Sequence, residues 1–329
     1  ARWLTQYEIS SEENFGNKDA LGFHIPGMWS KILDLQECFL QEAPSNDLRL
    51  AVRNYAINKG LDFFDVRNQE GFLRTLMLRQ NSQGEWMVLF QLYREEKENR
   101  EQLFDYILEK FPQIKTLVYA INPKQNDSIY DLDVQTYFGE GFIYEEMDGL
   151  KFKIGPKSFF QTNYKQALNF YRKTLEFAEI SENDVVYDLY TGTGTIAQYI
   201  AKKAKYVIGI ESVQEAIDAA KEHAKLNGLD NCEFYCGDMK DVFTEEFLAN
   251  HPKPNVLVTD PPRDGMHQKV VEQILKLAPP KIVYVSCNSA TQARDLALMK
   301  EHYDVVKILP VDMFPQTHHV ENIALLIKK

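Results

Sequence analysis

The stretch "VVYDLYTGTGTIA", residues 185–197, decides the fold of this chain. A β-branched apolar run ends near Asp188, and Gly192 and Gly194 then lead into a segment with helical character. Glycines at such a strand–helix turn let a ligand approach the backbone close to a helix N-terminus. Roughly twenty residues further on, "VIGIES" ends a second strand at Glu211, where an acid can bind ribose hydroxyls. The stretch therefore predicts a nucleotide-type cofactor at a strand end.

Strand-like and helix-like segments alternate on both sides of this turn, from about residue 165 to the C-terminus. This rhythm predicts an α/β, Rossmann-like domain with a mostly parallel sheet that is covered on both faces. The last two strands are joined without a helical pattern, so the last strand is expected to be antiparallel. The predicted strands are residues 185–190, 206–211, 232–238, 255–262, 281–287, 303–312 and 321–329.

The first part of the chain has a different pattern. Helical spacing in residues 47–60 and 100–111, a hairpin pattern in 71–93 and a strand in 116–122 indicate a smaller α+β domain. We therefore expect two domains, residues 1–150 and 151–329.

The acids after the first three strands of the larger domain are Asp188, Glu211 and Asp238. Carboxylates repel phosphates, so this set favours a cofactor without phosphates, such as S-adenosylmethionine. The glycine turn alone leaves a dinucleotide open, because Ala197 occupies a position that the GxGxxG/A fingerprint permits. The patterning favours a methyltransferase, and an NAD-dependent dehydrogenase remains an alternative.

Two further loops at the same predicted edge carry reactive side chains. "DPPRDG" places Asp260 and Arg263 after the fourth strand, and Cys287 follows the fifth. A free cysteine is either a small buried hydrophobe or a thiolate nucleophile. The loop before the last strand, "DMFPQTHHVEN", holds Asp312, His318, His319 and Glu321. Adjacent histidine side chains diverge, so we do not expect a metal there.

Composition narrows the class of protein. The 329 residues are 44% hydrophobic and carry a formal net charge of −11, which argues against broad, non-specific binding to nucleic acid. No apolar run is long enough to span a membrane, and no signal peptide is visible. Four scattered cysteines fit a reducing cytoplasm rather than a disulfide framework. The opening "ARWLTQYEIS" has no clear element start, and we expect the chain to begin inside a longer protein.

Six motifs in order resemble the RNA uracil-5 methyltransferases, the S-adenosylmethionine-dependent enzymes that make 5-methyluridine. "SFFQTN" looks nearer to the branch that acts on 23S ribosomal RNA. Residues 29–41 and 71–79 look like the family's central domain. The motifs are "KSFFQTN" (157–163), "DLYTGTG" (188–194), "GIE" (209–211), "DPPRDG" (260–265), "YVSCNSATQARDL" (284–296) and "DMFPQTHHVE" (312–321).

The resemblance implies a role for each matching residue. Cys287 would be the nucleophile that adds to carbon 6 of uracil, and Glu321 the base that removes the carbon 5 proton. Arg263 and Phe160 would lie near the target base or the RNA. The residues that would hold S-adenosylmethionine are Gln161, Tyr190, Thr195, Glu211, Asp238 and Asp260.

This chain departs from the family pattern in three places. Thr191 follows "DLY" where many members have Cys, and Ser289 follows "SCN" where many have Pro. The N-terminal RNA-binding barrel and three cysteines of an iron–sulfur cluster are missing. Cys38 matches the fourth cluster ligand, so a cluster is expected only in a longer protein.

The resemblance implies ribosomal RNA as the partner, with transfer RNA as the alternative substrate. A catalytically idle RNA-binding module remains open, although the intact Cys287 and Glu321 pair argues against it. We expect a cytoplasmic monomer.

Overall fold

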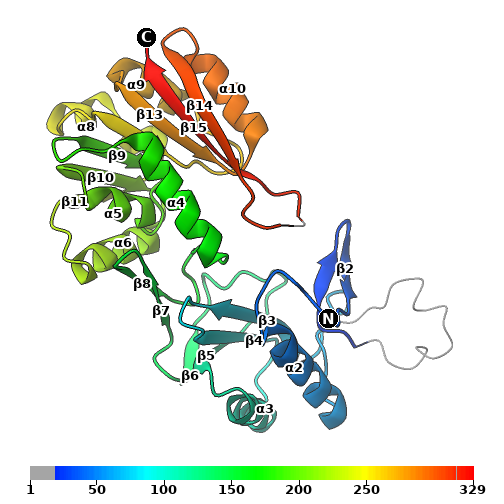
Figure 1. The fold of residues 1–329 in the computed structure, drawn as a ribbon. Coiled ribbons are helices and arrows are strands. Elements are labelled where there is room, and N and C mark those ends of the chain that lie inside the picture. The colour runs from blue at the N-terminus through cyan, green and yellow to red at the C-terminus, as the bar shows by residue number, and fades with distance from the viewer. Residues whose placement is uncertain (1–18, 316) are drawn as a thin grey trace. The chain divides into compact units, whose positions relative to one another are not determined.

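The computed structural model describes residues 19–315 and 317–329, and the predicted irregular opening lies outside this range. The chain forms two compact units (Figure 1). One unit comprises Ala1–Ile143 and Ile154–Lys157, and the other comprises Tyr144–Lys153 and Ser158–Lys329. The boundary expected after residue 150 falls at the start of the strand β8 (Leu150–Ile154), so the chain passes between the units more than once.

The larger unit is built on a seven-stranded sheet with the order β11-β10-β9-β12-β13-β15-β14. The first five strands in this order are parallel, and β15 is antiparallel to both of its neighbours, which confirms the predicted α/β fold. The strands are β9 (Val185–Leu189), β10 (Tyr206–Glu211), β11 (Cys232–Cys236), β12 (Val256–Thr259), β13 (Lys281–Ser286), β14 (Tyr303–Val311) and β15 (Glu321–Lys328).

Helices cover both faces of this sheet because its central strands are apolar on both sides. In β13, Val283 and Val285 belong to the hydrophobic core on one face, and Ile282 and Tyr284 belong to the core on the other. The first core includes α4 (Tyr164–Ala178), α5 (Thr195–Ala201) and α6 (Gln214–Leu226). The second lies under α7 (Met239–Val242), α8 (Glu245–Asn250), α9 (Gln268–Leu277) and α10 (Ser289–Met299).

A short ribbon of β7 (Ile143–Met147) and β8 precedes α4, and two side chains, from α6 and its C-cap residue, hold β8 in place. Asn227 accepts from the Lys151 amide (2.7 Å) and donates to the Lys151 carbonyl (2.9 Å). The buried His223 accepts from the Lys153 amide through Nε2 (3.1 Å), and its Nδ1 lies 3.2 Å from the Thr193 carbonyl. His223 thereby connects β8 with the glycine turn, and burial lowers its pKa.

From residue 19 onward, the smaller unit contains a four-stranded sheet with the order β3-β4-β5-β6 and the helices α2 and α3. The predicted hairpin is confirmed: β3 and β4 are antiparallel, and the Asn81 side chain accepts from the Gln83 and Glu85 amides in the turn. None of the described helices is both long and apolar enough to cross a membrane. The elements are β1 (Phe23–Ile25), β2 (Met28–Leu33), α2 (Ser45–Lys59), β3 (Leu73–Gln80), β4 (Trp86–Leu92), α3 (Lys97–Lys110), β5 (Ile114–Ile121) and β6 (Gln135–Phe138).

Candidate active site

The carboxyl ends of the parallel strands bring the predicted site residues to one edge of the sheet. Asp260 follows β12, and Cys287 follows β13, its neighbour in the sheet. Tyr190 follows β9, which pairs with β12 on the other side, and Glu211 ends β10. Ligands of open parallel sheets bind at this edge.

Cys287 and Glu321 face each other across neighbouring strands. The last bonded pair of β13 and β15 is Ser286 with Asn322, and one further step of the antiparallel register places Cys287 opposite Glu321. Residues opposite each other in such a pair have Cβ atoms about 5 Å apart. The register therefore places a thiol beside a carboxyl group, and Asn322 fixes it further by donating to Gln292 of α10 (2.5 Å).

Burial and charge act on both groups. Desolvation raises the pKa of the Cys287 thiol, and the carboxyl groups of Glu321 and Asp260 raise it further. Arg263 opposes this shift through its charge and a hydrogen bond to the thiol. Desolvation also raises the pKa of Glu321, again against the effect of Arg263. Arg263 is thus the cation that favours the ionised forms of both residues.

The helix after Cys287 holds the Arg263 loop. Asn288 caps α10 by accepting from the Ala290 amide (3.1 Å), and its Nδ2 donates to the Arg263 carbonyl (3.0 Å). Thr291 Oγ1 donates to the same carbonyl (3.0 Å). The backbone that carries Arg263 is therefore fixed to the segment that carries the thiol.

Asp295 adds a second attachment from inside α10. Its buried Oδ2 accepts from the Met266 amide (2.8 Å) and from the Tyr284 hydroxyl (2.6 Å), and its Oδ1 accepts from Arg294 (2.8 Å). Gly265 has a φ of +77°, and a Cβ there would lie 2.7 Å from Asp295 Oδ2. Sequence analysis missed Asp295, because the two partners of its Oδ2 lie 11 and 29 residues away in the chain.

The glycine turn is left-handed at three positions. Tyr190, Gly192 and Gly194 have φ of +63°, +55° and +76°. A Cβ on Gly194 would lie 2.8 Å from Ala220 Cβ, so this glycine lets the turn pack against α6. A Cβ on Gly192 would meet no atom within 4 Å, so this glycine faces open space. The second glycine therefore serves packing, and the first leaves room for a ligand.

The predicted cofactor residues beside this turn differ in their surroundings. Glu211 accepts from the Gly192 amide (3.2 Å) and from the Ser212 amide (2.7 Å), which fixes its carboxylate at the turn. Asp238 is exposed and forms an ion pair with Lys240 (2.6 Å), which lowers the pKa of Asp238. Thr195 is buried in the first turn of α5.

Asp188 is buried and Asp260 is half-buried, and within the described residues no cation offsets the charge of either. Asp188 accepts from Thr191 Oγ1 (2.6 Å), and its Oδ1 has no hydrogen-bond partner among the described residues. Burial raises the pKa of Asp188 to about 7. Asp260 reaches solvent in part, yet desolvation, followed by repulsion from Glu321 and Asp188, raises its pKa to about 8. Such a set suits a positively charged ligand without phosphates.

The segment 158–163 between β8 and α4 carries Phe160 and Gln161, which are both half-buried. Phe160 packs against the core beside Phe152, with ring centroids 5.9 Å apart. Asn163 caps α4 and donates to the Met313 carbonyl (2.9 Å), so the segment is tied to the loop that leads to Glu321.

The expectation that the side chains of His318 and His319 diverge is wrong, because their rings contact each other. The rings of His318 and His319 lie 4.1 Å apart, and their loop leaves His318 exposed. No group of three His, Cys, Asp or Glu residues suited to a metal occurs within 19–315 and 317–329.

Comparison with known proteins extends the match beyond single motifs. A sequence model of the tRNA (uracil-5-)-methyltransferase family matches residues 135–329. An uncharacterized RNA methyltransferase of Bacteroides thetaiotaomicron is 51% identical over 328 residues, which span 99% of this chain and 72% of that protein. One of Porphyromonas gingivalis is 52% identical over 338 residues, with the same coverage of 99% and 72%.

A solved structure shows the same similarity. It is the Pyrococcus abyssi tRNA (uracil-54, C5)-methyltransferase in complex with S-adenosyl-L-homocysteine. The two share 31% sequence identity and a TM-score of 0.76, and the match covers 91% of this chain and 71% of that one. The chain belongs to the tRNA (uracil-5-)-methyltransferase family and is an S-adenosylmethionine-dependent RNA (uracil-5-)-methyltransferase.

Proposed function

We propose that this enzyme methylates carbon 5 of a uridine in 23S ribosomal RNA, with Cys287 as the nucleophile and Glu321 as the base. The observation that carries the proposal is the β13–β15 register, which sets the thiol opposite the carboxyl group. Arg263 stands beside both groups as a cation. An idle RNA-binding module would not need this pair.

The chemistry requires both residues because carbon 5 of uracil is a poor nucleophile. The Cys287 thiol first loses its proton to solvent, and the thiolate then adds to carbon 6, which moves electrons toward oxygen 4 and makes carbon 5 nucleophilic. Bound S-adenosylmethionine supplies the methyl group that carbon 5 takes. Glu321 then removes the carbon 5 proton, and the electrons of that bond expel the thiolate. The raised pKa of Glu321 suits a proton acceptor.

Arg263 and Phe160 are proposed to contact the target base. Arg263 favours the thiolate in the free enzyme, and its guanidinium offers donors for the oxygen that gains charge during addition. Phe160 offers an aromatic ring next to Gln161, which is proposed to hold the cofactor. The base must leave its stack to reach the thiol, so an RNA loop or bulge is the expected target.

The residues of the site fit S-adenosylmethionine. Gly192 leaves space at the turn, and the charges of the buried Asp188 and the half-buried Asp260 would be offset by the positive charges of the sulfonium and amino groups. Asp188 joins the set on the evidence of its unpaired Oδ1. Besides Asp188, the residues proposed to hold the cofactor are Gln161, Tyr190, Thr195, Glu211, Asp238 and Asp260.

Transfer RNA is the second candidate substrate. The motif "SFFQTN" supports ribosomal RNA, whereas the similarity to a tRNA (uracil-54, C5)-methyltransferase supports transfer RNA. We propose ribosomal RNA as the substrate and a cytoplasmic monomer as the acting form.

An iron–sulfur cluster does not fit the residues of this chain. Such clusters take four thiolates. Cys38 is the only cysteine in the sequence of the smaller unit, because Cys232, Cys236 and Cys287 belong to the larger one. Cys38 could serve as a cluster ligand only with cysteines from a longer protein.

The test uses RNA in which 5-fluorouridine replaces uridine. Fluorine at carbon 5 cannot leave as a proton, so the methylated adduct should persist and be visible by intact mass. We expect a protein–RNA species with ribosomal RNA that is absent in Cys287→Ala. An adduct with transfer RNA alone would favour the second substrate. RNA binding without an adduct on either RNA would contradict the mechanism and favour the idle module.

A further inference from the structure

The loop between β5 and β6, residues 122–134 of the smaller unit, is polar but tightly built. Arg74 of β3 is buried beneath the loop, and its guanidinium forms hydrogen bonds with the loop. It donates to the carbonyls of Asn122 (2.8 Å), Lys124 (2.5 Å) and Asn126 (2.9 Å), and to the Asp127 carboxylate (2.9 Å). One buried cation therefore sets the path of the loop.

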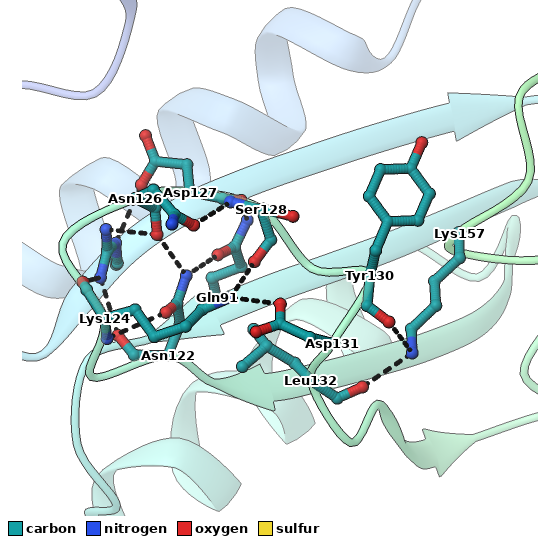
Figure 2. Close-up of polar contacts among 11 residues, drawn as sticks. Gln91, Asn122, Lys124, Asn126, Asp127, Ser128, Tyr130, Asp131, Leu132 and Lys157 are labelled. Carbon is teal, nitrogen blue, oxygen red and sulfur yellow. Dashed lines mark hydrogen bonds and ion pairs between the residues drawn. The ribbon is translucent and has the colours of Figure 1, made fainter.

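Two buried amides add to this support (Figure 2). Gln91 of β4 donates to the Asp127 carbonyl (3.1 Å), and Asn122 donates to Gln91 Oε1 (2.7 Å) and to the Asn126 carbonyl (3.0 Å). Buried and fully bonded amides of this kind restrict a backbone to one arrangement. The sheet thus holds the loop through side chains of β3 and β4.

Two adjacent side chains of the loop differ sharply in their exposure to solvent. Ile129 is 6% exposed and packs on Leu89 and Val118, whereas Tyr130 is 66% exposed. The Lys157 ammonium donates to the carbonyls of Tyr130 (3.0 Å) and Leu132 (2.8 Å). Figure 2 shows the Tyr130 ring directed away from the hydrogen-bonded network, beside the Lys157 side chain.

The Lys157 ammonium is bound to two backbone carbonyls of the loop, and its charge also acts on Asp131, whose pKa is lowered chiefly by the hydrogen bond from Lys124. Asp127 is paired with Arg74, and Asp131 is paired with Lys124. Lys157 has no carboxylate within ion-pair distance in the described part of the chain, and the Tyr130 ring stacks on no other aromatic ring there. The supported backbone thus presents an exposed aromatic ring, and the Lys157 side chain lies beside it with its ammonium on the loop carbonyls.

We propose that Tyr130 is a stacking platform for an unpaired base of the RNA substrate and that Lys157 contacts the adjoining phosphate. Proteins that bind single-stranded RNA combine aromatic faces with cations in this way. The net charge of −11 argues against broad, non-specific electrostatic binding of RNA, which favours local contacts such as this one. The inference rests on the proposed function, since it takes single-stranded RNA as the ligand.

Filter binding of the full chain to 23S ribosomal RNA and unmodified transfer RNA transcripts tests the proposal. A Cys287→Ala background keeps chemistry out of the measurement. Tyr130→Ala should weaken binding about 5- to 150-fold, which corresponds to the ~1–3 kcal/mol of one stacked base. Tyr130→Phe should bind as the parent does. Phe138→Ala is the matched control, because Phe138 is 46% exposed at the opposite end of the same sheet.

Salt dependence separates the two roles. Lys157→Ala should lower the slope of log K against log salt by about 0.7, the value for one phosphate of a single strand, whereas Tyr130→Ala should leave it unchanged. Cross-linking to 5-iodouridine-substituted transcripts should recover the peptide that contains Tyr130. Unchanged melting temperatures would exclude a structural effect.

Two outcomes would overturn the inference, and they are distinguishable. If the parent binds RNA and Tyr130→Ala binds equally well, the stacking platform is wrong and the proposed function stands. If the parent binds neither transcript, the proposed substrate class fails and the platform fails with it.

Discussion

The two glycines of the cofactor turn should respond to the same substitution in opposite ways. Gly192 and Gly194 both have left-handed backbones, but a Cβ meets open space at Gly192 and Ala220 Cβ at 2.8 Å at Gly194. Ala220 Cβ is attached directly to the α6 backbone and cannot rotate away. We expect Gly192→Ala to weaken cofactor binding and Gly194→Ala to destabilise the fold.

The magnitudes follow from these contacts. A left-handed alanine costs about 1–2 kcal/mol, of which roughly 0.4–1 kcal/mol is recovered because the unfolded chain loses freedom. Gly192→Ala should therefore cost ~1 kcal/mol of folding free energy. Gly194→Ala adds an overlap of about 1–3 kcal/mol, for a total of ~2–4 kcal/mol. At about 2–4 °C per kcal/mol, the melting temperature should fall by roughly 2–4 °C and 5–15 °C, respectively.

Calorimetric titration with S-adenosylhomocysteine and thermal unfolding of both variants provide the assay. If the Gly192 methyl group takes the place of part of the ligand, affinity should fall about 5- to 150-fold, as an overlap of ~1–3 kcal/mol requires. Wild-type affinity in Gly192→Ala would refute a ligand at this face of the turn. Equal melting temperatures for the two variants would refute the assignment of Gly194 to packing.

Three further predictions concern groups around the site. Asp295→Ala should release the Arg263 loop and slow the formation of the 5-fluorouridine adduct about 100-fold, which is the effect of a ~1 Å misplacement. The affinity for S-adenosylhomocysteine should stay unchanged. An equal loss of adduct formation and of affinity would point to general unfolding. Binding of S-adenosylmethionine should strengthen from pH 6 to 8.5 and release protons, because the raised pKa values of Asp188 and Asp260, about 7 and about 8, leave both acids protonated at low pH. Calorimetry in buffers of different ionisation enthalpy measures the number of protons released. A pH-independent affinity would contradict the prediction. His223→Leu should cost ~2–4 kcal/mol by removing the buried hydrogen bonds of His223 with the Lys153 amide and the Thr193 carbonyl. Because the pKa of His223 is lowered in the folded state, the wild type should also lose stability as the pH falls through about 6.5. Urea unfolding at pH 7.5 and 5.5 measures this loss, and His223→Leu should lack the part of it that His223 causes.

The sequence predicted the sheet because its signals are local. Apolar runs such as 281–286 and 323–326 alternate with helical segments or end in recognisable turns. The alternation with helices also predicts that most of the strands run parallel. The expected antiparallel last strand followed from the absence of a helix in the connection, and the structure confirms it. The meeting of Cys287 and Glu321 depends on the register, which a sequence pattern alone does not specify.

Other features depend on partners far apart in the chain. Asp295 reaches Met266 across 29 residues, and Asn227 reaches Lys151 across 76, so neither contact leaves a local pattern. The β7–β8 ribbon consists of short strands of five residues each, and it was missed because mixed polar and apolar residues there resemble a linker. The same reason explains why the predicted boundary fell inside β8.

The position of β15 has a consequence for the biogenesis of the enzyme. This strand is synthesised after both of its neighbours, yet it lies between β13 and β14 and starts with Glu321. Until translation has passed Lys328, a nascent chain can present the thiol of Cys287 but has no strand to set a carboxylate opposite it. If Cys287 and Glu321 act as proposed, a polypeptide without a complete β15 lacks the paired site.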